Sequence, residues 1–562
     1  MTSSVERRSI GADRKPWHCI AGAGLLAVTV CQITVHASPL PVAIGVNVTA
    51  STYGNDSSAL PPDPNGAVGP QHFVEFINGA FVVFDKTDGS NIKDISDLEF
   101  WSDANLIISP DDVVTDPRVI YDPQSQRWFA TMVDVNANAA DPTLHANDFL
   151  FAVSTTADPT GPWNGFKFEA DPTHGDFADF PTMGLDANGV YISGDMFKGE
   201  NNPQIGPSLV AIPKRDLLLA TPTIANRTYF GVMSDSVRGM ALQPVTCFDG
   251  SETGQVLSVQ NYGEDSNPYT NLVTFTVQNV NNGPSATLSG STFPPVASYM
   301  VPDNGDFGAP VLTPLQPDGT SQIQANDARF AARVYAVNGV VYAAHNTEYN
   351  GHIAIQWYRI NAATHAVLEQ GTLTDGTMDL FFPSIAANAN GTVVICCNGS
   401  SGSTFVSCYA FVGTTTGSVT TFQGPFLLQS GVTDYHGDDE LVDEFEGLPV
   451  FSRWGDYSTT SVDPNNSNIF WTIQMYPSDT DVWSTEITQI ITGPPTLSIE
   501  VTGGMVTVSW LVNSDAFTLE SNTDLTTGTW VPIPPGNYTT NNGIVSYQEP
   551  VSNSEKMFRL QY

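Results

Sequence analysis

Residues 382–395 read Phe382-Pro383-Ser384-Ile385-Ala386-Ala387-Asn388-Ala389-Asn390-Gly391-Thr392-Val393-Val394-Ile395, which is a complete β-hairpin signal. Pro383 opens a short apolar strand, and residues 388–391 form the turn. Asn and Gly suit such a turn because both adopt positive φ at little cost. The β-branched run after Gly391 predicts the return strand. A unit of this kind decides the architecture if it recurs along the chain.

The same pattern recurs, most clearly in Pro181-Thr182-Met183-Gly184-Leu185-Asp186-Ala187-Asn188-Gly189. A repeated all-β unit of 50 to 89 residues is typical of a β-propeller blade, in which the first of four antiparallel strands lines the central channel. An array of β-sandwiches with coincidental turns is the alternative. Seven positions mark the start of the first strand in successive units: Pro64, Pro117, Pro181, Pro244, Arg333, Pro383 and Ser458.

We therefore predict an all-β chain, with a seven-bladed β-propeller over residues 38–491 and an insertion loop at about 281–324. Thr492-Gly493-Pro494-Pro495 has the composition of a linker. Short alternating strands follow it, and their spacing predicts a small C-terminal β-sandwich over residues 495–562.

The first 37 residues have the features of a secretion signal. Basic residues precede an apolar run from Cys19 to Val35, and Val35-His36-Ala37 fits the small-x-small cleavage pattern. An uncleaved anchor is the alternative, since the apolar run is about as long as the shortest membrane spans. We expect a secreted or extracytoplasmic protein, at the cell surface or in the periplasm, that is not inserted in the membrane after cleavage.

The chain is strongly acidic. Its 562 residues carry a formal net charge of −38, and removal of the first 37 residues, with four basic and two acidic side chains, would make it −40. Such a field repels nucleic acid and anionic surfaces and attracts cations. We expect no nucleic-acid partner, and a monomer.

Four cysteines remain beyond the signal segment, namely Cys247, Cys396, Cys397 and Cys408. Cys396 and Cys397 lie on one strand of an expected hairpin and Cys408 on its return strand. In an oxidising compartment this predicts one cross-strand disulfide from Cys408 to either Cys396 or Cys397.

Three motifs resemble a broad group of secreted bacterial β-propeller proteins that are often labelled sialidase-like. They are Pro61-Pro62-Asp63-Pro64-Asn65-Gly66-Ala67-Val68-Gly69-Pro70, Asp116-Pro117-Arg118-Val119 with Arg127-Trp128-Phe129, and Arg453-Trp454-Gly455-Asp456-Tyr457. The stretch Phe517-Thr518-Leu519-Glu520-Ser521-Asn522-Thr523-Asp524-Leu525, with Thr529-Trp530 and Phe558-Arg559-Leu560, resembles a fibronectin-III or immunoglobulin-type module common on secreted bacterial proteins. The resemblance implies a secreted, multidomain propeller.

Residues just before each first strand should converge at one mouth of the channel. Four of these are acidic, Asp63, Asp116, Asp179 and Asp456, and we expect Arg118, Arg333 and Arg453 to lie close by at the same mouth. Trp128 and Trp471, on return strands, are better explained by packing between blades.

Three interpretations of the aspartates compete. Asp before a strand commonly caps a turn by accepting backbone N–H bonds. Clustered carboxylates also suit Ca²⁺, which takes oxygen ligands and offsets their repulsion. Glycoside hydrolysis needs one protonated and one ionised carboxyl across a sugar. For that reaction the candidate catalytic residues are Asp116, Asp179 and Asp456, and the candidate substrate-binding residues are Asp63, Arg118, His174, Arg333, Arg453, Trp454 and Tyr457.

The leading functional hypothesis is recognition or cleavage of an extracellular polysaccharide or surface glycan at the channel mouth. In it, Trp454 or Tyr457 stacks on a sugar ring. A polysaccharide lyase would use Tyr457 or His174 as the base and Arg118 to neutralise a uronate, although the acidic field opposes an anionic polymer. A non-catalytic binding or adhesion propeller is the third possibility.

Overall fold

The computed structural model describes residues 41–198, 204–260, 268–302, 312–319, 323–437, 452–493, 497–511, 517–524, 526, 529–541, 544–551 and 556–561. The predicted signal segment, residues 1–37, lies outside the described residues. None of the helices in the described ranges has the length and apolar content of a membrane span.

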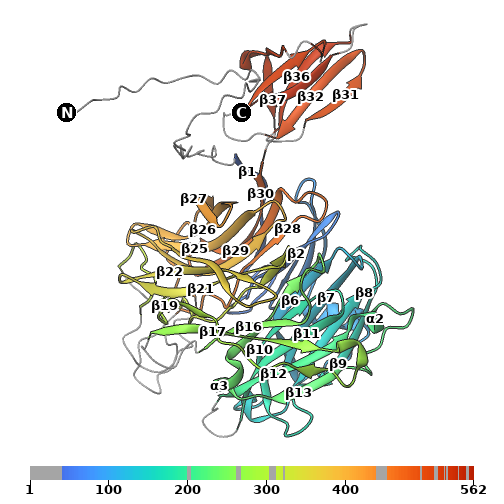
Figure 1. The fold of residues 1–562 in the computed structure, drawn as a ribbon, viewed down its shortest axis with the longest axis vertical. Coiled ribbons are helices and arrows are strands. Elements are labelled where there is room, and N and C mark those ends of the chain that lie inside the picture. The colour runs from blue at the N-terminus through green and yellow to red at the C-terminus, as the bar shows by residue number, and fades with distance from the viewer. Residues whose placement is uncertain are drawn as a thin grey trace, which may run out of the picture. The chain divides into compact units, whose positions relative to one another are not determined.

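Seven β-sheets follow one another along residues 42–492 of the described chain, and we number them as blades by their inner strands. Figure 1 shows them in succession from the blue to the orange part of the chain. Blade 1 contains β2 (Asn65–Val68), β3 (His72–Ile77), β4 (Ala80–Asp85) and β5 (Asn91–Ile95). Blade 2 contains β6 (Asp112–Asp122), β7 (Arg127–Asn136), β8 (Asp148–Ser154) and β9 (Trp163–Glu169). Blade 3 contains β10 (Phe177–Leu185), β11 (Gly189–Phe197), β12 (Gln204–Pro213) and β13 (Thr228–Val232).

The remaining blades have the same antiparallel core with small additions. Blade 4 contains β14 (Met240–Pro244), β16 (Gln255–Val259) and β17 (Tyr269–Gln278), and both β18 (Thr287–Leu288) and β19 (Pro295–Tyr299) pair with β17. Blade 5 contains β15 (Thr246–Cys247), β20 (Tyr335–Val337), β21 (Val340–Tyr349), β22 (His352–Asn361) and β23 (Val367–Leu373). Blade 6 contains β24 (Asp379–Ala387), β25 (Thr392–Ser401), β26 (Thr404–Thr416) and β27 (Val419–Gln429). Blade 7 contains β28 (Thr459–Val462), β29 (Ile469–Asp479), β30 (Val482–Thr492) and β1 (Val42–Thr52).

The blades close into a ring. Inner strands of successive blades contact one another from β2 through β6 and β10 to β14, and from β24 through β28 back to β2. Strand β1 completes the closure, because it pairs antiparallel with β30 as the outermost strand of blade 7, starting with Val42 opposite Thr492. The N-terminal part of the described chain thus joins the last blade to the first, and the fold is the predicted all-β propeller.

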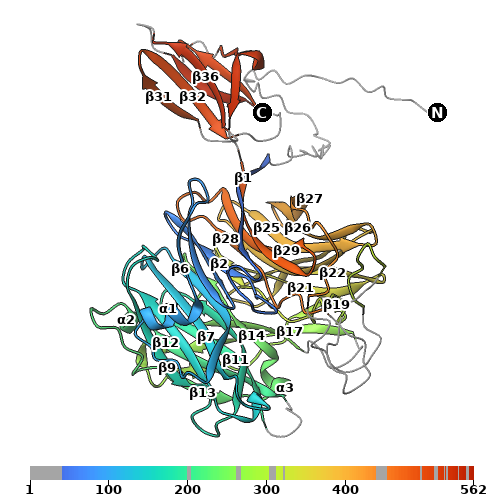
Figure 2. The same ribbon diagram turned by 180° about the vertical axis from the view of Figure 1, so that it is seen from behind.

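The helices are short connectors between strands. In Figure 2, α1 (Asp97–Asp103) lies beside blade 2, and Ser96 caps it by accepting the Glu99 N–H. The others are α2 (Lys214–Leu217), α3 (Asp235–Arg238) and the 3₁₀ turns η1 (Pro142–Leu144), η2 (Val280–Asn282) and η3 (Pro535–Asn537). The stretch 281–324, expected to be a loop, contains β18 and β19 of blade 4.

A β-bulge recurs near the start of four inner strands. The ladder register shifts between Thr115 and Arg118, Asp179 and Thr182, Met240 and Gln243, and Phe381 and Ser384. The residue inside each shift has positive φ, and in three cases proline follows it: Asp116 (61°), Phe180 (48°), Ala241 (47°) and Phe382 (50°). Proline is tolerated here because a bulge leaves one residue outside the ladder.

The fourth unit is the exception to the sequence alignment. Its bulge lies at Ala241, three residues before the predicted marker Pro244, which ends β14. Gln243 is therefore not the counterpart of the residues at the other entries. The prediction was wrong here because no proline follows the bulge residue Ala241. The nearest proline that precedes an Asp-Gly turn is Pro244, which lies at the end of the strand.

Aromatic residues pack between the blades, as the sequence predicted for two tryptophans. Trp128 of blade 2 is buried with Ala67 and Val74 of blade 1, and Trp471 of blade 7 lies with its ring centroid 5.8 Å from that of Phe73 in blade 1. Both indoles also donate hydrogen bonds, from Trp128 Nε1 to Ala157 O at 2.9 Å and from Trp471 Nε1 to Asp463 Oδ2 at 3.0 Å. The inter-blade role is confirmed for both.

The predicted disulfide is wrong. The four described cysteines are all free and buried. Residues 402 and 403 form the β25–β26 turn, so Cys408 lies opposite Asn398, whereas Cys396 and Cys397 lie opposite Ala410 and Tyr409. A cross-strand disulfide needs directly facing side chains, and this register does not provide them.

The C-terminal part forms two small sheets with one shared core, a β-sandwich. One sheet contains β31 (Ser498–Thr502), β32 (Met505–Leu511), β36 (Ile544–Pro550) and β35 (Tyr538–Asn541). The other contains β34 (Val531–Pro532), β33 (Thr518–Asn522) and β37 (Met557–Gln561). The buried residues between them are Val508, Trp510, Leu519 and Ile533. The likeness to a fibronectin-III or immunoglobulin module stays a prediction.

One buried acid in blade 1 should make stability depend on pH. Glu75 on β3 accepts hydrogen bonds from Ser51 Oγ of β1 (2.7 Å) and Thr485 Oγ1 of β30, and burial raises its pKa to about 7. The folded state therefore holds this proton more tightly than the unfolded state. The contribution of protonated Glu75 to the free energy of unfolding is full below pH 4.5 and is lost as pH rises to about 7. The shift corresponds to about 3 kcal/mol.

We expect the wild-type protein to unfold at a lower temperature at pH 8 than at pH 5, and Glu75→Gln to reduce that difference. The measurement is calorimetric unfolding across this pH range. Glu500→Gln, an exposed change on β31, is the matched control and should leave the difference intact. Equal pH dependence in Glu75→Gln and wild type would contradict the assignment.

Candidate functional site

A cavity of about 650 Å³ lies at the mouth of the channel where the inner strands begin. Blades 1, 2, 3 and 7 contribute to its lining, which includes Asp63, Asn78, Asp116, Asp179, Arg453 and Asp456. The four aspartates that the repeat alignment placed at one mouth therefore do meet there. Their chemical role stays a prediction.

Three of these carboxylates are crowded together. Oxygen atoms of Asp63, Asp116 and Asp456 lie within 4.8 Å of one another. Asp63 is 2% exposed and accepts two hydrogen bonds, from Asn78 Nδ2 at 2.9 Å and from the backbone N–H of Asp456 at 2.8 Å. The bond from Asp456 joins blade 7 to blade 1.

Asp116 joins the next two blades in the same way. Its backbone N–H donates to Asn78 Oδ1 of blade 1 at 2.9 Å, and its Oδ2 accepts the backbone N–H of Phe180 in blade 3 at 3.1 Å. Asp195 repeats the contact by accepting the backbone N–H of Ala241 in blade 4 at 3.1 Å. Each donor is a bulge residue, so these side chains satisfy N–H groups that the ladder leaves out. Asp63 and Asp116 thus accept backbone N–H bonds, as the capping interpretation expects, but from neighbouring blades and not from their own turns.

Solvent reaches four charged side chains of the cavity lining, namely Asp56, Asp179, Arg453 and Asp456. Asp179 is half-buried. The Asp456 side chain is 15% exposed, and its Oδ1 accepts hydrogen bonds from Arg453 Nη2 and Asn326 Nδ2, both at 3.1 Å. The Arg453 side chain is 40% exposed. A ligand in the cavity could contact these side chains.

Burial and mutual repulsion keep protons in the cluster. Burial, with the charges of Asp456 and Asp116, raises the pKa of Asp63 well above its usual value. Burial, with the charges of Asp179 and Asp456, raises the pKa of Asp116 to about 7. Burial and Asp456 also raise the pKa of Asp179, whereas the carboxylate of Asp456 raises the pKa of Arg453. The mouth therefore holds carboxyl groups that keep their protons to a higher pH than an ordinary aspartate does.

Another ion pair lies beside this cluster. Arg329 donates from Nε and Nη2 to the carboxylate of Asp327, with the Nη2 contact at 2.6 Å. Its guanidinium also lies 4.5 Å from the ring centroid of Phe180. Asp195, which lies opposite Asp179 in the β10–β11 ladder, has a pKa raised by burial to about 6.

Two of the predicted substrate-binding arginines do not line this cavity. Arg118 is buried, with its guanidinium 3.4 Å from the ring centroid of Tyr457, and it donates to Pro181 O at 2.8 Å and Ala331 O at 2.9 Å. Arg333 donates to Val119 O at 2.7 Å, and burial lowers its pKa to about 10. Both arginines hold inner strands together.

The predicted aromatic platforms and the predicted base are also corrected. Tyr457 is buried with its hydroxyl donating to Pro117 O at 3.1 Å, and Trp454 is buried against Tyr435 with Nε1 donating to Asn398 Oδ1 at 3.0 Å. Stacking on a sugar is wrong for both, because neither ring reaches solvent. His174 lies outside the cavity lining, in the loop before β10.

Sequence reasoning missed Asn78, Asn326 and Asp195. Of the three, Asn78 is the one that the sequence could have indicated. It stands in the Asn-Gly turn after β3, and β3 runs antiparallel to β2 toward the same mouth. Asn326 comes from the long segment between blades 4 and 5, for which no repeat alignment exists.

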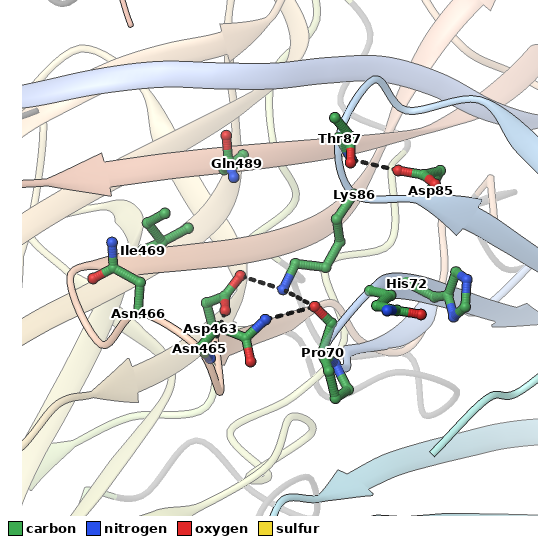
Figure 3. Close-up of a pocket in the computed structure, with 11 residues that line it drawn as sticks. Pro70, His72, Asp85, Lys86, Thr87, Asp463, Asn465, Asn466, Ile469 and Gln489 are labelled. Atoms are coloured by element: carbon green, nitrogen blue, oxygen red, sulfur yellow. Dashed lines mark hydrogen bonds and ion pairs between the residues drawn. The ribbon is translucent and has the colours of Figure 1, made fainter. Parts of the chain in front are cut away.

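A second cavity, of about 520 Å³, lies between blades 7 and 1 at the strand ends away from the mouth. Figure 3 shows Lys86 pointing into it toward Asp463, with an Nζ–Oδ2 distance of 2.6 Å. Lys86 Nζ also donates to Gly69 O at 2.8 Å, and Asn465 Nδ2 donates to Pro70 O at 2.6 Å. Lys86 is thus held by both of the blades that it joins.

No protein-family model and no curated protein matches the chain. Solved structures that resemble it include a Trypanosoma rangeli sialidase in complex with 2,3-difluorosialic acid, at 10% identity and a TM-score of 0.32 over 67% of this chain and 54% of the sialidase. The chain thus spans about half the length of that sialidase. Two exo-β-1,3-galactanases also match. The one from Phanerochaete chrysosporium, with β-1,3-galactotriose, has 12% identity and a TM-score of 0.30 over 92% of this chain and 96% of the galactanase. The one from Clostridium thermocellum has 9% identity and a TM-score of 0.31 over 82% of this chain and 81% of the galactanase.

At such TM-scores these matches do not bear on the activity. The fold rests on the sheet order and ring closure, and the candidate site on the side chains described above. Together they define a β-propeller with a carboxylate-lined channel mouth.

Proposed function

We propose that this protein is secreted and hydrolyses glycosidic bonds of neutral extracellular glycans at the channel mouth. The cavity of about 650 Å³ carries the proposal, because it is large enough for a sugar and combines raised-pKa carboxyls with an accessible ion-paired carboxylate. The net charge of −38 favours neutral over anionic substrates.

The accessible residues divide into the two roles that the reaction needs. Asp179, half-buried with a raised pKa, would protonate the leaving oxygen. Asp456, oriented by Arg453 and Asn326, would supply the ionised carboxylate. Asp116 lies behind them and keeps a proton in the cluster, and Asp63 fixes the backbone of Asp456.

A non-catalytic binding propeller is the second candidate. It is favoured by the backbone hydrogen bonds of Asp63 and Asp116, which show that carboxylates at this mouth also serve the fold. A polysaccharide lyase is not supported, because neither Tyr457 nor His174 lines the cavity.

The test is release of reducing ends from a panel of neutral polysaccharides, with binding to the same panel measured in parallel. Turnover of at least one neutral polymer is expected, with little on polyuronates. Binding without turnover anywhere on the panel would replace hydrolysis by the binding function.

Activity should fall on the alkaline side of pH 7. Burial and the charges of Asp179 and Asp456 raise the pKa of Asp116 to about 7, and burial also raises the pKa of Asp179, so the cluster loses the Asp116 proton as pH rises through that value. We expect kcat/KM on the best substrate of the panel to decline as pH rises from 6 to 9. A flat profile over that range would contradict a protonated carboxyl as the acid.

Ca²⁺ at the mouth stays a prediction. Carboxylate oxygens of Asp63, Asp116 and Asp456 are close enough to share a cation, which would offset their repulsion, although Arg453 already supplies one positive charge there. If Ca²⁺ binds, adding it at 100 times its Kd stabilises the fold by about 2.7 kcal/mol. The measurement is a thermal melt with Ca²⁺ or EGTA, and an unchanged Tm would contradict the site.

A further inference from the structure

A second group of metal-ligating side chains lies in the loop between β9 and β10, apart from the mouth cavity. Asp171, His174 and Asp176 each place a potential ligand atom within 4.8 Å of the others. Asp171 and Asp176 are buried, and the side chain of His174 is 60% exposed. The loop thus combines two buried carboxylates with one imidazole that solvent reaches.

One buried oxygen of this group accepts no hydrogen bond from any described residue outside the group. The Asp171 side chain is 1% exposed, and its Oδ1 accepts the Thr173 N–H and the Tyr229 hydroxyl, both at 3.0 Å. Its Oδ2 is buried without a hydrogen bond among the described residues, and His174 Nδ1 lies 3.4 Å from it. An unmatched buried carboxylate oxygen is costly, and a cation bound there would remove the cost.

We propose that Asp171, His174 and Asp176 bind a divalent transition-metal ion of the Zn²⁺ type. The imidazole is the reason for this choice, because Ca²⁺ and Mg²⁺ take oxygen ligands, whereas Zn²⁺ accepts His nitrogen together with Asp oxygen. The exposed imidazole leaves the remaining positions to water. Within the described part of the chain, Lys198 forms an ion pair with the group, with Nζ 3.7 Å from Asp176 Oδ1, and its side chain is 56% exposed, so it can move away.

The ion would fix the β9–β10 loop, which is hydrogen-bonded to β13 and leads into β10. Tyr229 belongs to β13 at the outer edge of blade 3, and its hydroxyl already fixes Asp171. Asp176 directly precedes β10, and Asp179 follows three residues later. Binding here would fix the segment that leads into the channel, and it does not depend on what the mouth does.

The test is isothermal titration calorimetry, in which Zn²⁺ is added to EDTA-treated protein. The proteins compared are the wild type, His174→Ala and His365→Ala. His174→Ala removes an exposed side chain, so the fold should be retained. His365→Ala is the matched control, since that imidazole contacts Thr292 Oγ1 at 2.9 Å and belongs to none of the carboxylate groups found among the described residues.

We expect His174→Ala to lose one Zn²⁺ per chain or to bind it at least about tenfold more weakly, with His365→Ala unchanged. Asp171→Asn should show the same loss. Equal Zn²⁺ stoichiometry and Kd in wild type and His174→Ala would overturn the proposal, as would a wild type that binds no Zn²⁺. Binding of Ca²⁺ at this loop that is unaffected by His174→Ala would overturn the choice of metal.

Discussion

Asp179→Asn is expected to lower kcat/KM on a neutral glycan by about 10²- to 10⁴-fold, the usual contribution of a general acid. The amide has nearly the same shape as the carboxyl but cannot transfer the proton. The loss should appear in kcat, with KM little changed, because the cavity keeps its size and its other contacts. Initial rates of reducing-end release measure both parameters.

Asp88→Asn is the matched control, since Asp88 is exposed in the turn between β4 and β5. This variant should retain wild-type turnover. Asp456→Asn should lose activity as Asp179→Asn does, and Asp116→Asn should lose part of it. Full activity in all three mouth variants would remove the catalytic assignment.

Trp128→Ala is expected to lower the free energy of unfolding by about 3–5 kcal/mol, as for other buried tryptophans. Trp128 is fully buried between blades 1 and 2, and its indole donates to Ala157 O. The fit to blade 1 is close, because a Cβ added at Gly69 would lie 2.3 Å from the indole ring. Alanine would leave a cavity between blades 1 and 2, and the packing of these two blades against each other would be lost there.

Calorimetric unfolding measures this effect. Trp128→Phe keeps most of the apolar volume and loses the Nε1 hydrogen bond, so we expect a smaller loss of about 1–2 kcal/mol. A Tm of Trp128→Ala within a degree of wild type would contradict the inter-blade role.

The architecture could be predicted from the sequence because the inner strands share one local requirement. Each of several bulges needs a residue at positive φ, and proline often follows, so Pro117, Pro181 and Pro383 mark the same place in three blades. In blade 4 the bulge residue is Ala241 and no proline follows it, so the alignment placed the start of the strand at Pro244, which is wrong.

The meeting of the four aspartates could be predicted for the same reason, since inner strands of a propeller begin at one mouth. Their surroundings could not. Whether Tyr457 reaches solvent depends on Arg118, which covers its ring and comes from a strand more than 300 positions earlier. Trp454 is likewise covered by Tyr435, and nothing local to either residue indicates this.

The disulfide prediction was wrong because of a small difference in strand register. Placing the hairpin turn at residues 402–403 puts Asn398 opposite Cys408, and a shift of one or two residues would have placed a cysteine there. Register of this kind depends on the turn, and Ser400-Ser401-Gly402-Ser403 allows more than one turn from sequence alone.

A crystal structure of Asp179→Asn soaked with an oligosaccharide of the best substrate tests the central claim most directly. The sugar should lie in the cavity lined by Asp63, Asp116, Asp456 and Arg453, with the glycosidic oxygen next to residue 179 and Asp456 on the other side of the scissile bond. A sugar bound only elsewhere on the propeller or on the C-terminal sandwich, with the mouth cavity free of it, would contradict glycan hydrolysis at the channel mouth.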